Sequence, residues 1–166
     1  MIEITLLVTA LLFGGMVLYS FGFAAFVFNA LPPETAGPLI RRAFPHFYLF
    51  VLASSAVAAA IAFAFDPVSS AILIAITVTT ILARQVLMPA INTATDAGSI
   101  TRFNVLHSLS VVITLAHIGA AAIVLIRLAG SCREGSFLNW ILCAGKKHHT
   151  TIGIVNGPYA QPVQER

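Results

Sequence analysis

Four long and mostly apolar stretches of this chain contain no Asp, Glu, Lys or Arg. They cover residues 4–33, 43–65, 67–83 and 103–126. A helix needs about 20 apolar residues to cross the hydrocarbon core of a bilayer, and backbone groups inside that core must be paired within the helix. The first, second and fourth stretches meet this length. The pattern therefore predicts an all-α protein whose four helices each span a membrane.

We expect these transmembrane helices at about residues 4–29, 45–65, 68–91 and 103–129. The third reaches spanning length by continuing past Arg84. Short connections between consecutive helices are typical of an up-down-up-down four-helix bundle. Residues 1–130 would form this transmembrane domain, and residues 131–166 a polar, flexible C-terminal tail.

The overall charge excludes other classes of protein. Only 9% of the residues are charged, and the chain has nine basic and six acidic side chains. A soluble domain usually carries about 25% charged residues, enough to cover its surface. A nucleic-acid surface needs clustered Lys and Arg, whereas residues 1–130 contain no lysine. The expected partner is the lipid bilayer, and nucleic acid is not expected to bind.

One short pattern occurs twice. The sequence Ala-Gly-x3-Arg-x4-His ends at His46 and again at His107, and its arginines are Arg41 and Arg102. If the repeat is structural, the bundle consists of two repeated helical hairpins, and both histidines lie at the same depth. Arg84 falls near the same end when the third helix is counted from its start at about 1.5 Å per residue.

These residues suggest two kinds of cofactor site. Two histidines facing each other across a bundle can hold a b-type haem, with nearby arginines pairing its propionates. The candidate haem residues are His46, His107, Arg84, Arg41 and Arg102. The alternative is copper bound by Met88 with the same two histidines. The other interpretation is that these residues have a structural role. Near the ends of helices, arginine can reach lipid phosphates and histidine can form a hydrogen bond with a carbonyl.

Hydroxyl-bearing residues follow the same helices. His107, Ser110, Thr114 and His117 recur at helical spacing on the fourth span. Transport of a small solute would need an open path along such a stripe, with Thr77 and Arg84 contributing from the third span. Hydroxyls at these spacings are also what helices use to pack in lipid, and packing is the interpretation we favour for them.

Several short motifs in a fixed order resemble the family of transmembrane protein 205 and its bacterial relatives. The resemblance covers about residues 8–129 and rests on Leu31-Pro32, Gly37, Phe44-Pro45, Phe47-Tyr48, Arg84, Pro89, Phe103 and His107-x-Leu109-Ser110. It implies a four-helix membrane protein with no assigned enzymatic activity. The bacterial relatives imply the bacterial inner (plasma) membrane.

No Ser-His-Asp set, paired acids within the bundle or Cys-x-x-Cys motif is present in the sequence. The principal hypothesis is therefore a small integral membrane protein without enzymatic activity of its own. It would act as an accessory subunit of a larger membrane complex or as a transport-related bundle, and it could form a homo-oligomer. Counted over both sides of the bundle, the positive-inside rule ties at four basic residues against four. The first span usually dominates, however, and Arg41 and Arg42 follow it, which favours both termini outside the cytoplasm.

Overall fold

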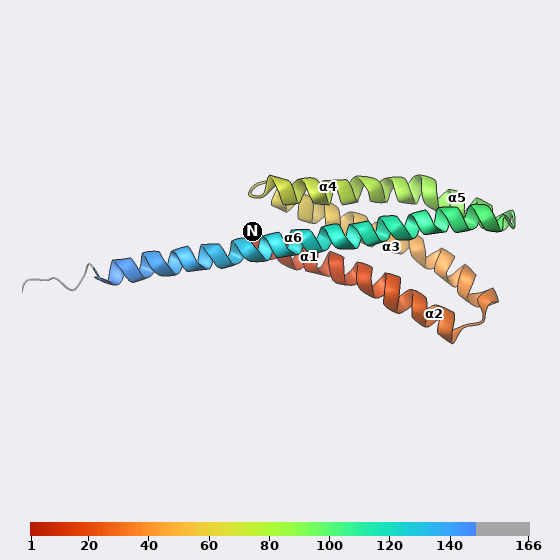
Figure 1. Ribbon diagram of the computed structural model, residues 1–166, viewed down its shortest axis with the longest axis horizontal. Helices are drawn as coiled ribbons and strands as arrows, with labels where there is room; N and C mark the ends of the chain where they lie inside the picture. The colour runs from red at the N-terminus through yellow and green to blue at the C-terminus, as the bar shows by residue number, and fades with distance from the viewer. Residues whose placement is uncertain (149–166) are drawn as a thin grey trace, which may run out of the picture. The chain divides into compact units, whose positions relative to one another are not determined.

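The structure is a computed structural model. It describes the backbone of residues 1–148 and the side chains of residues 1–131 apart from Pro33. These described residues are helical and contain no strand, which confirms the all-α prediction. The helices, drawn in Figure 1, are α1 (Ile2–Val17), the π-helical turn η1 (Leu18–Phe23), α2 (Ala24–Ala30), α3 (Pro33–Ala62), α4 (Pro67–Leu82), the π-helical turn η2 (Ala83–Leu87), α5 (Met88–Asp96) and α6 (Ile100–His148).

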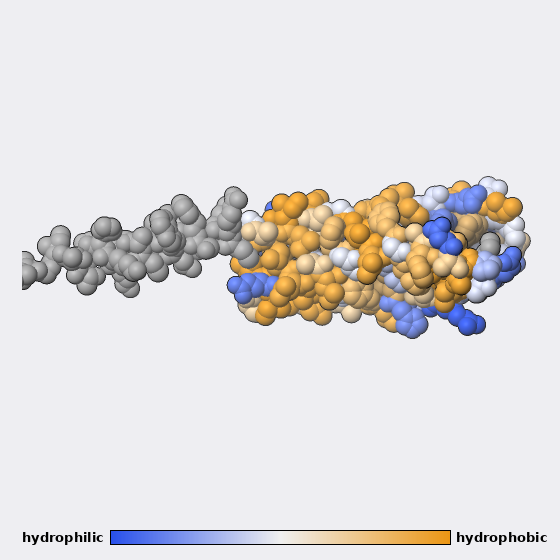
Figure 2. All heavy atoms as spheres, turned by 90° about the horizontal axis from the view of Figure 1, so that it is seen from below, coloured by the Kyte–Doolittle hydropathy of each residue, from blue (hydrophilic) through white to orange (hydrophobic). Residues whose placement is uncertain are grey.

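These elements form four runs long and apolar enough to cross a bilayer. They are Ile2–Ala30, Glu34–Ala62, Pro67–Asp96 and Ile100–Ser131, with 29, 29, 30 and 32 residues. Short connections reverse the chain direction between them, as Figure 1 shows. Apolar residues cover most of the described surface in Figure 2, and hydrophilic residues gather near its ends. The chain is an integral membrane protein built as a four-helix bundle.

The second span begins earlier than the sequence predicts. We expected it to start at about residue 45, but α3 begins at Pro33 and contains Pro38 and Pro45. Proline is favoured at the first helical position, where its missing N–H has no helical partner to lose. Pro38 has no N–H to donate to the carbonyl of Glu34, four residues earlier. Glu34 is exposed, so the loss of this one hydrogen bond does not end the helix.

The third and fourth spans extend further than predicted. A proline inside a helix removes a hydrogen bond and clashes with the carbonyl four residues earlier. Before Pro89 the helix widens into η2, where the Met88 N–H bonds to the carbonyl of Ala83, five residues back. The helix then continues to Asp96 instead of ending near residue 91, and α6 continues to His148 instead of ending near residue 129. The predicted flexible tail lies outside the residues whose side chains are described.

Residues Met1–Cys132 form one compact unit, and residues Arg133–Arg166 form a second. The core of the first unit consists of side chains from all four spans, among them Leu12, Met16, Val51, Ala58, Leu73, Ile76, Val124 and Leu128. α1 and α3 approach closely at Gly15. A Cβ atom at this position would collide with the ring of Phe50. α6 is the least covered span: 11% of its most apolar window is buried, against 22–33% for the others.

Candidate functional site

The two histidines of the sequence repeat both have exposed side chains. His46 Nδ1 lies 3.3 Å from the carbonyl oxygen of Arg42 on its own helix. His107 stacks on Phe103, also on its own helix, with ring centroids 5.4 Å apart. Each histidine is therefore engaged locally, and neither contact joins the two as ligands of one haem or copper ion.

Helix geometry explains the outward position of His107. It lies ten positions before His117, and ten positions fall about 80° short of three full turns of an α-helix. His117 is half-buried, whereas His107 is exposed at the edge of the same stripe. Met88, the third candidate copper ligand, packs against the apolar core. No group of three or more His, Cys, Asp or Glu residues suited to a metal ion occurs among the described residues.

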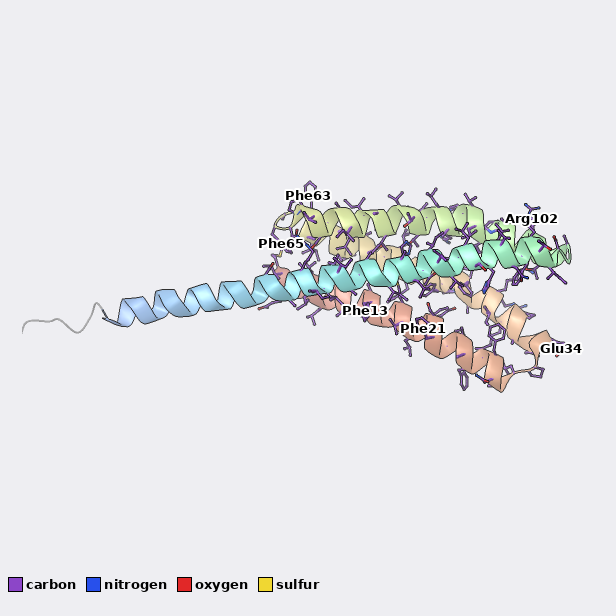
Figure 3. The ribbon with its side chains drawn as sticks, in the orientation of Figure 1. Phe13, Phe21, Glu34, Phe63, Phe65 and Arg102 are labelled. Carbon is purple, nitrogen blue, oxygen red and sulfur yellow. The ribbon has the colours of Figure 1, made fainter. Side chains whose placement is uncertain are left out.

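The candidate arginines differ in their surroundings. Arg41 forms a two-pronged ion pair with Asp96, both N–O distances being 2.8 Å, and its Nε donates to the Asn92 side chain at 2.8 Å. Arg84 is half-buried in η2, and Arg102 is exposed. Figure 3 shows Arg102 at the start of α6, at the same end of the bundle as Glu34. Arg41 thus connects α3 to α5 through a carboxylate of the protein itself.

A second ion pair lies at the opposite end of the third span. Arg127 of α6 is 3.3 Å from the Asp66 carboxylate and 3.4 Å from the Ser69 hydroxyl. Asp66 also accepts hydrogen bonds from the backbone N–H groups of Val68 and Ser69 and from the Ser69 hydroxyl, so it caps α4. The Ser69 hydroxyl, followed by Arg127, holds the pKa of Asp66 below its usual range, although burial acts in the opposite direction.

Polar side chains converge inside the bundle where α3, α4 and α6 meet. A cavity of about 10 Å³ lies there, and residues on several elements line it: Met16, Phe47, Tyr48, Val51, Thr80, Ala83, Ser110, Ile113, Thr114 and His117. Five of these ten are polar. Ser110, Thr114 and His117 belong to the stripe that the sequence analysis identified on the fourth span, and Thr80 belongs to the third.

Two cross-helix contacts lie beside this cavity, one between two lining residues and one between the lining residue His117 and the exposed Thr79. The hydroxyl oxygens of Tyr48 and Ser110 are 3.5 Å apart, and His117 Nε2 lies 2.6 Å from Thr79 Oγ1. Sequence analysis missed Tyr48 and Thr79 as members of a polar site. Their signal was weak, because Tyr48 belongs to an aromatic run and Thr79 belongs to a run of hydroxyl and apolar residues typical of helix packing. We call Tyr48, Thr79, Thr80, Ser110, Thr114 and His117 the polar crevice.

The fold and the polar crevice are those of a small integral membrane protein built as a four-helix bundle. Residues 7–99 match the model of the family described as Domain of unknown function (DUF4149). The match covers more than half of the chain, so the chain belongs to this family. It ends just before α6. No match was found among curated proteins or solved structures.

Proposed function

We propose that this protein is a non-enzymatic subunit of a larger membrane complex, and that the outward side of α6 is its contact surface. The observation that carries this proposal is the placement of small residues on that side. Ser108, Gly119 and Gly130 are all exposed and recur at every eleventh position. Eleven positions return almost to the same direction on an α-helix, so the three residues form one line.

The glycines of this line are not required by packing among the described residues. There, a Cβ atom built at Gly119 or Gly130 meets nothing within 4 Å. Glycine inside a helix costs about 1 kcal/mol relative to alanine. Helices in lipid associate through small residues that let two backbones approach closely. A partner helix seated against this line would explain why glycine occupies both positions.

The low coverage of α6 supports the same surface. Its apolar side chains, such as Val112 at 61% and Ile126 at 73% exposure, extend along the outward side. The internal polar crevice encloses about 10 Å³, which is far too little for a solute path. Assembly therefore accounts for the described geometry better than transport through the bundle.

The proposal also covers the wider family of the protein and the membrane in which it lies. The resemblance to transmembrane protein 205 and its bacterial relatives is part of the proposal for the four-helix architecture, and it supplies no reaction. We place the protein in the bacterial inner membrane with both termini outside the cytoplasm, since the end of the bundle with Arg41, Arg42 and Arg102 would then face the cytoplasm.

Photo-crosslinking in native membranes tests the contact surface. A photoreactive residue at Val112 on α6 should give an adduct of discrete mass, whereas one at the similarly exposed Leu11 on α1 should not. Gly119→Leu should weaken the adduct roughly tenfold, the equivalent of about 1.4 kcal/mol of association energy. Gly14→Leu is the matched control, because Gly14 is also exposed with nothing within 4 Å of a built Cβ.

The mass of the adduct separates the two kinds of partner. An adduct of twice the chain mass indicates a homo-oligomer, and any other discrete mass indicates a different subunit. No adduct at Val112, or equal loss in the two glycine variants, would contradict α6 as the contact surface.

A further inference from the structure

Threonine hydroxyls around the polar crevice all donate to carbonyls of their own helices. Thr80 donates to Ile76 at 2.7 Å, and Thr114 donates to Ser110 at 2.9 Å. A hydroxyl has one proton and two lone pairs. Once the proton is used in this way, the oxygen atom can only accept a further hydrogen bond. The crevice therefore offers acceptors and few donors.

His117 fits the same arrangement. Thr79 Oγ1 lies 2.6 Å from the Ala75 carbonyl oxygen and 2.6 Å from His117 Nε2. The carbonyl can only accept, so it takes the single hydroxyl proton of Thr79. The remaining contact then needs a proton on His117 Nε2. This assignment leaves the neutral imidazole with its lone pair on Nδ1.

The other contact in the crevice is too long to be a good direct hydrogen bond. Hydroxyl pairs usually lie about 2.5–3.0 Å apart, but Tyr48 and Ser110 are separated by 3.5 Å. A polar contact at such a distance is often completed by water. The cavity of about 10 Å³ beside them is at the lower limit for one water molecule, which also needs two to four polar partners.

We propose that the polar crevice binds a single water molecule and that His117 is a proton-binding residue reached through this water. The water can donate to the Thr80 or Thr114 oxygen and accept from the Tyr48 hydroxyl. A proton from bulk water adds to Nδ1 of the neutral imidazole and gives an imidazolium. Its Nε2–H stays on Thr79, and its new Nδ1–H needs an acceptor, which the water or a threonine oxygen provides.

The position of His117 makes this proton site intramembrane. His117 lies near the midpoint of the span Ile100–Ser131, so it is close to the middle of the bilayer. Ionisable residues at this depth mark functional sites by default, because they are costly to keep there. Tyr48 on α3 is the other titratable residue that lines the cavity. The lining residues from α1, α4, η2 and α6 include no carboxylate, lysine or arginine.

α6 is less tightly covered beside the crevice than beyond it. Ser110, Ile113, Thr114 and His117 are half-buried, whereas Ala121, Val124 and Leu128 are buried. The crevice therefore lies beside the less tightly packed part of α6. This inference concerns the inward side of α6 and is independent of the subunit role proposed for its outward side.

Nitrogen-15 NMR of the full chain in lipid nanodiscs, with labelled histidine, tests the proposal. The chain has five histidines, and His117→Gln assigns the signal of His117 by its loss. The expected result has three parts: the Nε2–H tautomer at alkaline pH, a cross-peak between the His117 ring and water, and reversible conversion to imidazolium on acidification. An Nδ1–H tautomer, a missing water cross-peak, or no conversion between pH 4 and 9 would each overturn it.

Two variants separate the proposed role from a packing role. Thr79→Val removes the acceptor of Nε2–H and should shift the tautomer mixture toward Nδ1–H. Thr93→Val is the matched control, because its exposed hydroxyl donates to the Pro89 carbonyl away from the crevice. If Thr79→Val fails to fold, Tyr48→Phe replaces it, and the His117–water cross-peak should fall at least threefold. An unchanged cross-peak in folded Tyr48→Phe would contradict the water site.

Discussion

The two halves of α6 within residues 100–131 are attached to the bundle in different ways. The later half buries Ala121, Val124 and Leu128 among apolar neighbours. The earlier part, taken as residues 100–117, has no fully buried side chain. Its Leu106 and Ile113 pack only partly buried against the core, and Ser110 and His117 add cross-helix hydrogen bonds. One helix therefore has an apolar, tightly packed segment and a polar, more loosely covered segment.

The two halves of α6 should therefore have different functions. Lipid tails are as apolar as a protein core, so helices in a bilayer gain little from hydrophobic transfer and are held mainly by close packing and hydrogen bonds. The packed half of α6 should fix its position, and the polar half should tolerate changes in hydration at His117. Substitutions in the two halves should therefore differ in size, and the predictions below run from the largest to the smallest.

Leu128→Ala should have the largest effect on stability. Leu128 is 1% exposed, and truncation leaves a cavity in the packed half of α6. Truncating a buried leucine to alanine costs about 2–5 kcal/mol in protein cores, so a loss of at least about 2 kcal/mol in the free energy of unfolding is expected. Denaturation by sodium dodecyl sulfate in mixed micelles, followed by circular dichroism, measures it. Leu115→Ala at an exposed position of the same helix is the control, and an equal loss there would remove the distinction between the two sides of α6.

Asp66→Ala should come next. This change removes the cap of α4 together with the partner of Arg127, and loss of a capping side chain typically costs about 1 kcal/mol. Asp96→Ala removes the ion pair with Arg41 at the other end of the bundle. The side chains of Arg41 and Asp96 are 37% and 66% exposed, and exposed pairs contribute roughly 0–1 kcal/mol. A larger loss for Asp96→Ala than for Asp66→Ala would mean that the end of the bundle with Arg41 contributes more to stability than the end with Asp66.

Acidification should weaken the contact between Asp66 and Arg127 of α6. The pKa of Asp66 in the folded protein is lowered below 3.8, so the unfolded chain takes up the proton first as the pH falls. The stabilisation is therefore complete above about pH 5 and is lost as the pH falls through the folded pKa. Unfolding free energies at pH 7, 5 and 3 for wild type and Asp66→Asn measure it. An equal loss at pH 3 in both proteins would assign the acid sensitivity to other groups.

The spans could be predicted from the sequence because uncharged length is a direct requirement of the bilayer. Their ends could not be predicted well, because proline has different effects by position. Pro33 starts a helix, and Pro38 interrupts only the exposed first turns of α3. Before Pro89 the helix widens into η2 instead of ending. Local rules state that proline disturbs a helix but leave open how the helix adapts.

The candidate site was less predictable, because a repeated local pattern does not repeat its tertiary partners. Arg41 pairs with Asp96, but the position that corresponds to Asp96 in the second copy of the repeat is Gly157, so the repeat supplies Arg102 with no equivalent carboxylate. The histidines of the repeat are exposed on their own helices. The sequence analysis placed His117 on the polar stripe of the fourth span, yet its contact with Thr79 depends on how α4 and α6 are rotated against each other, which spacing alone does not fix.

Tyr48→Phe should have the smallest effect on stability. Its hydroxyl lies 3.5 Å from Ser110, and direct hydrogen bonds between membrane helices average only about 0.6 kcal/mol. A loss well below that of Leu128→Ala is therefore expected in the same denaturation assay. Tyr19→Phe removes the same atom from η1, where the buried hydroxyl has no hydrogen-bond partner in the part of the chain that the structure describes, so this variant should be unchanged or slightly more stable. A loss in Tyr48→Phe as large as that in Leu128→Ala would mean that the polar half of α6 is held as firmly as the packed half.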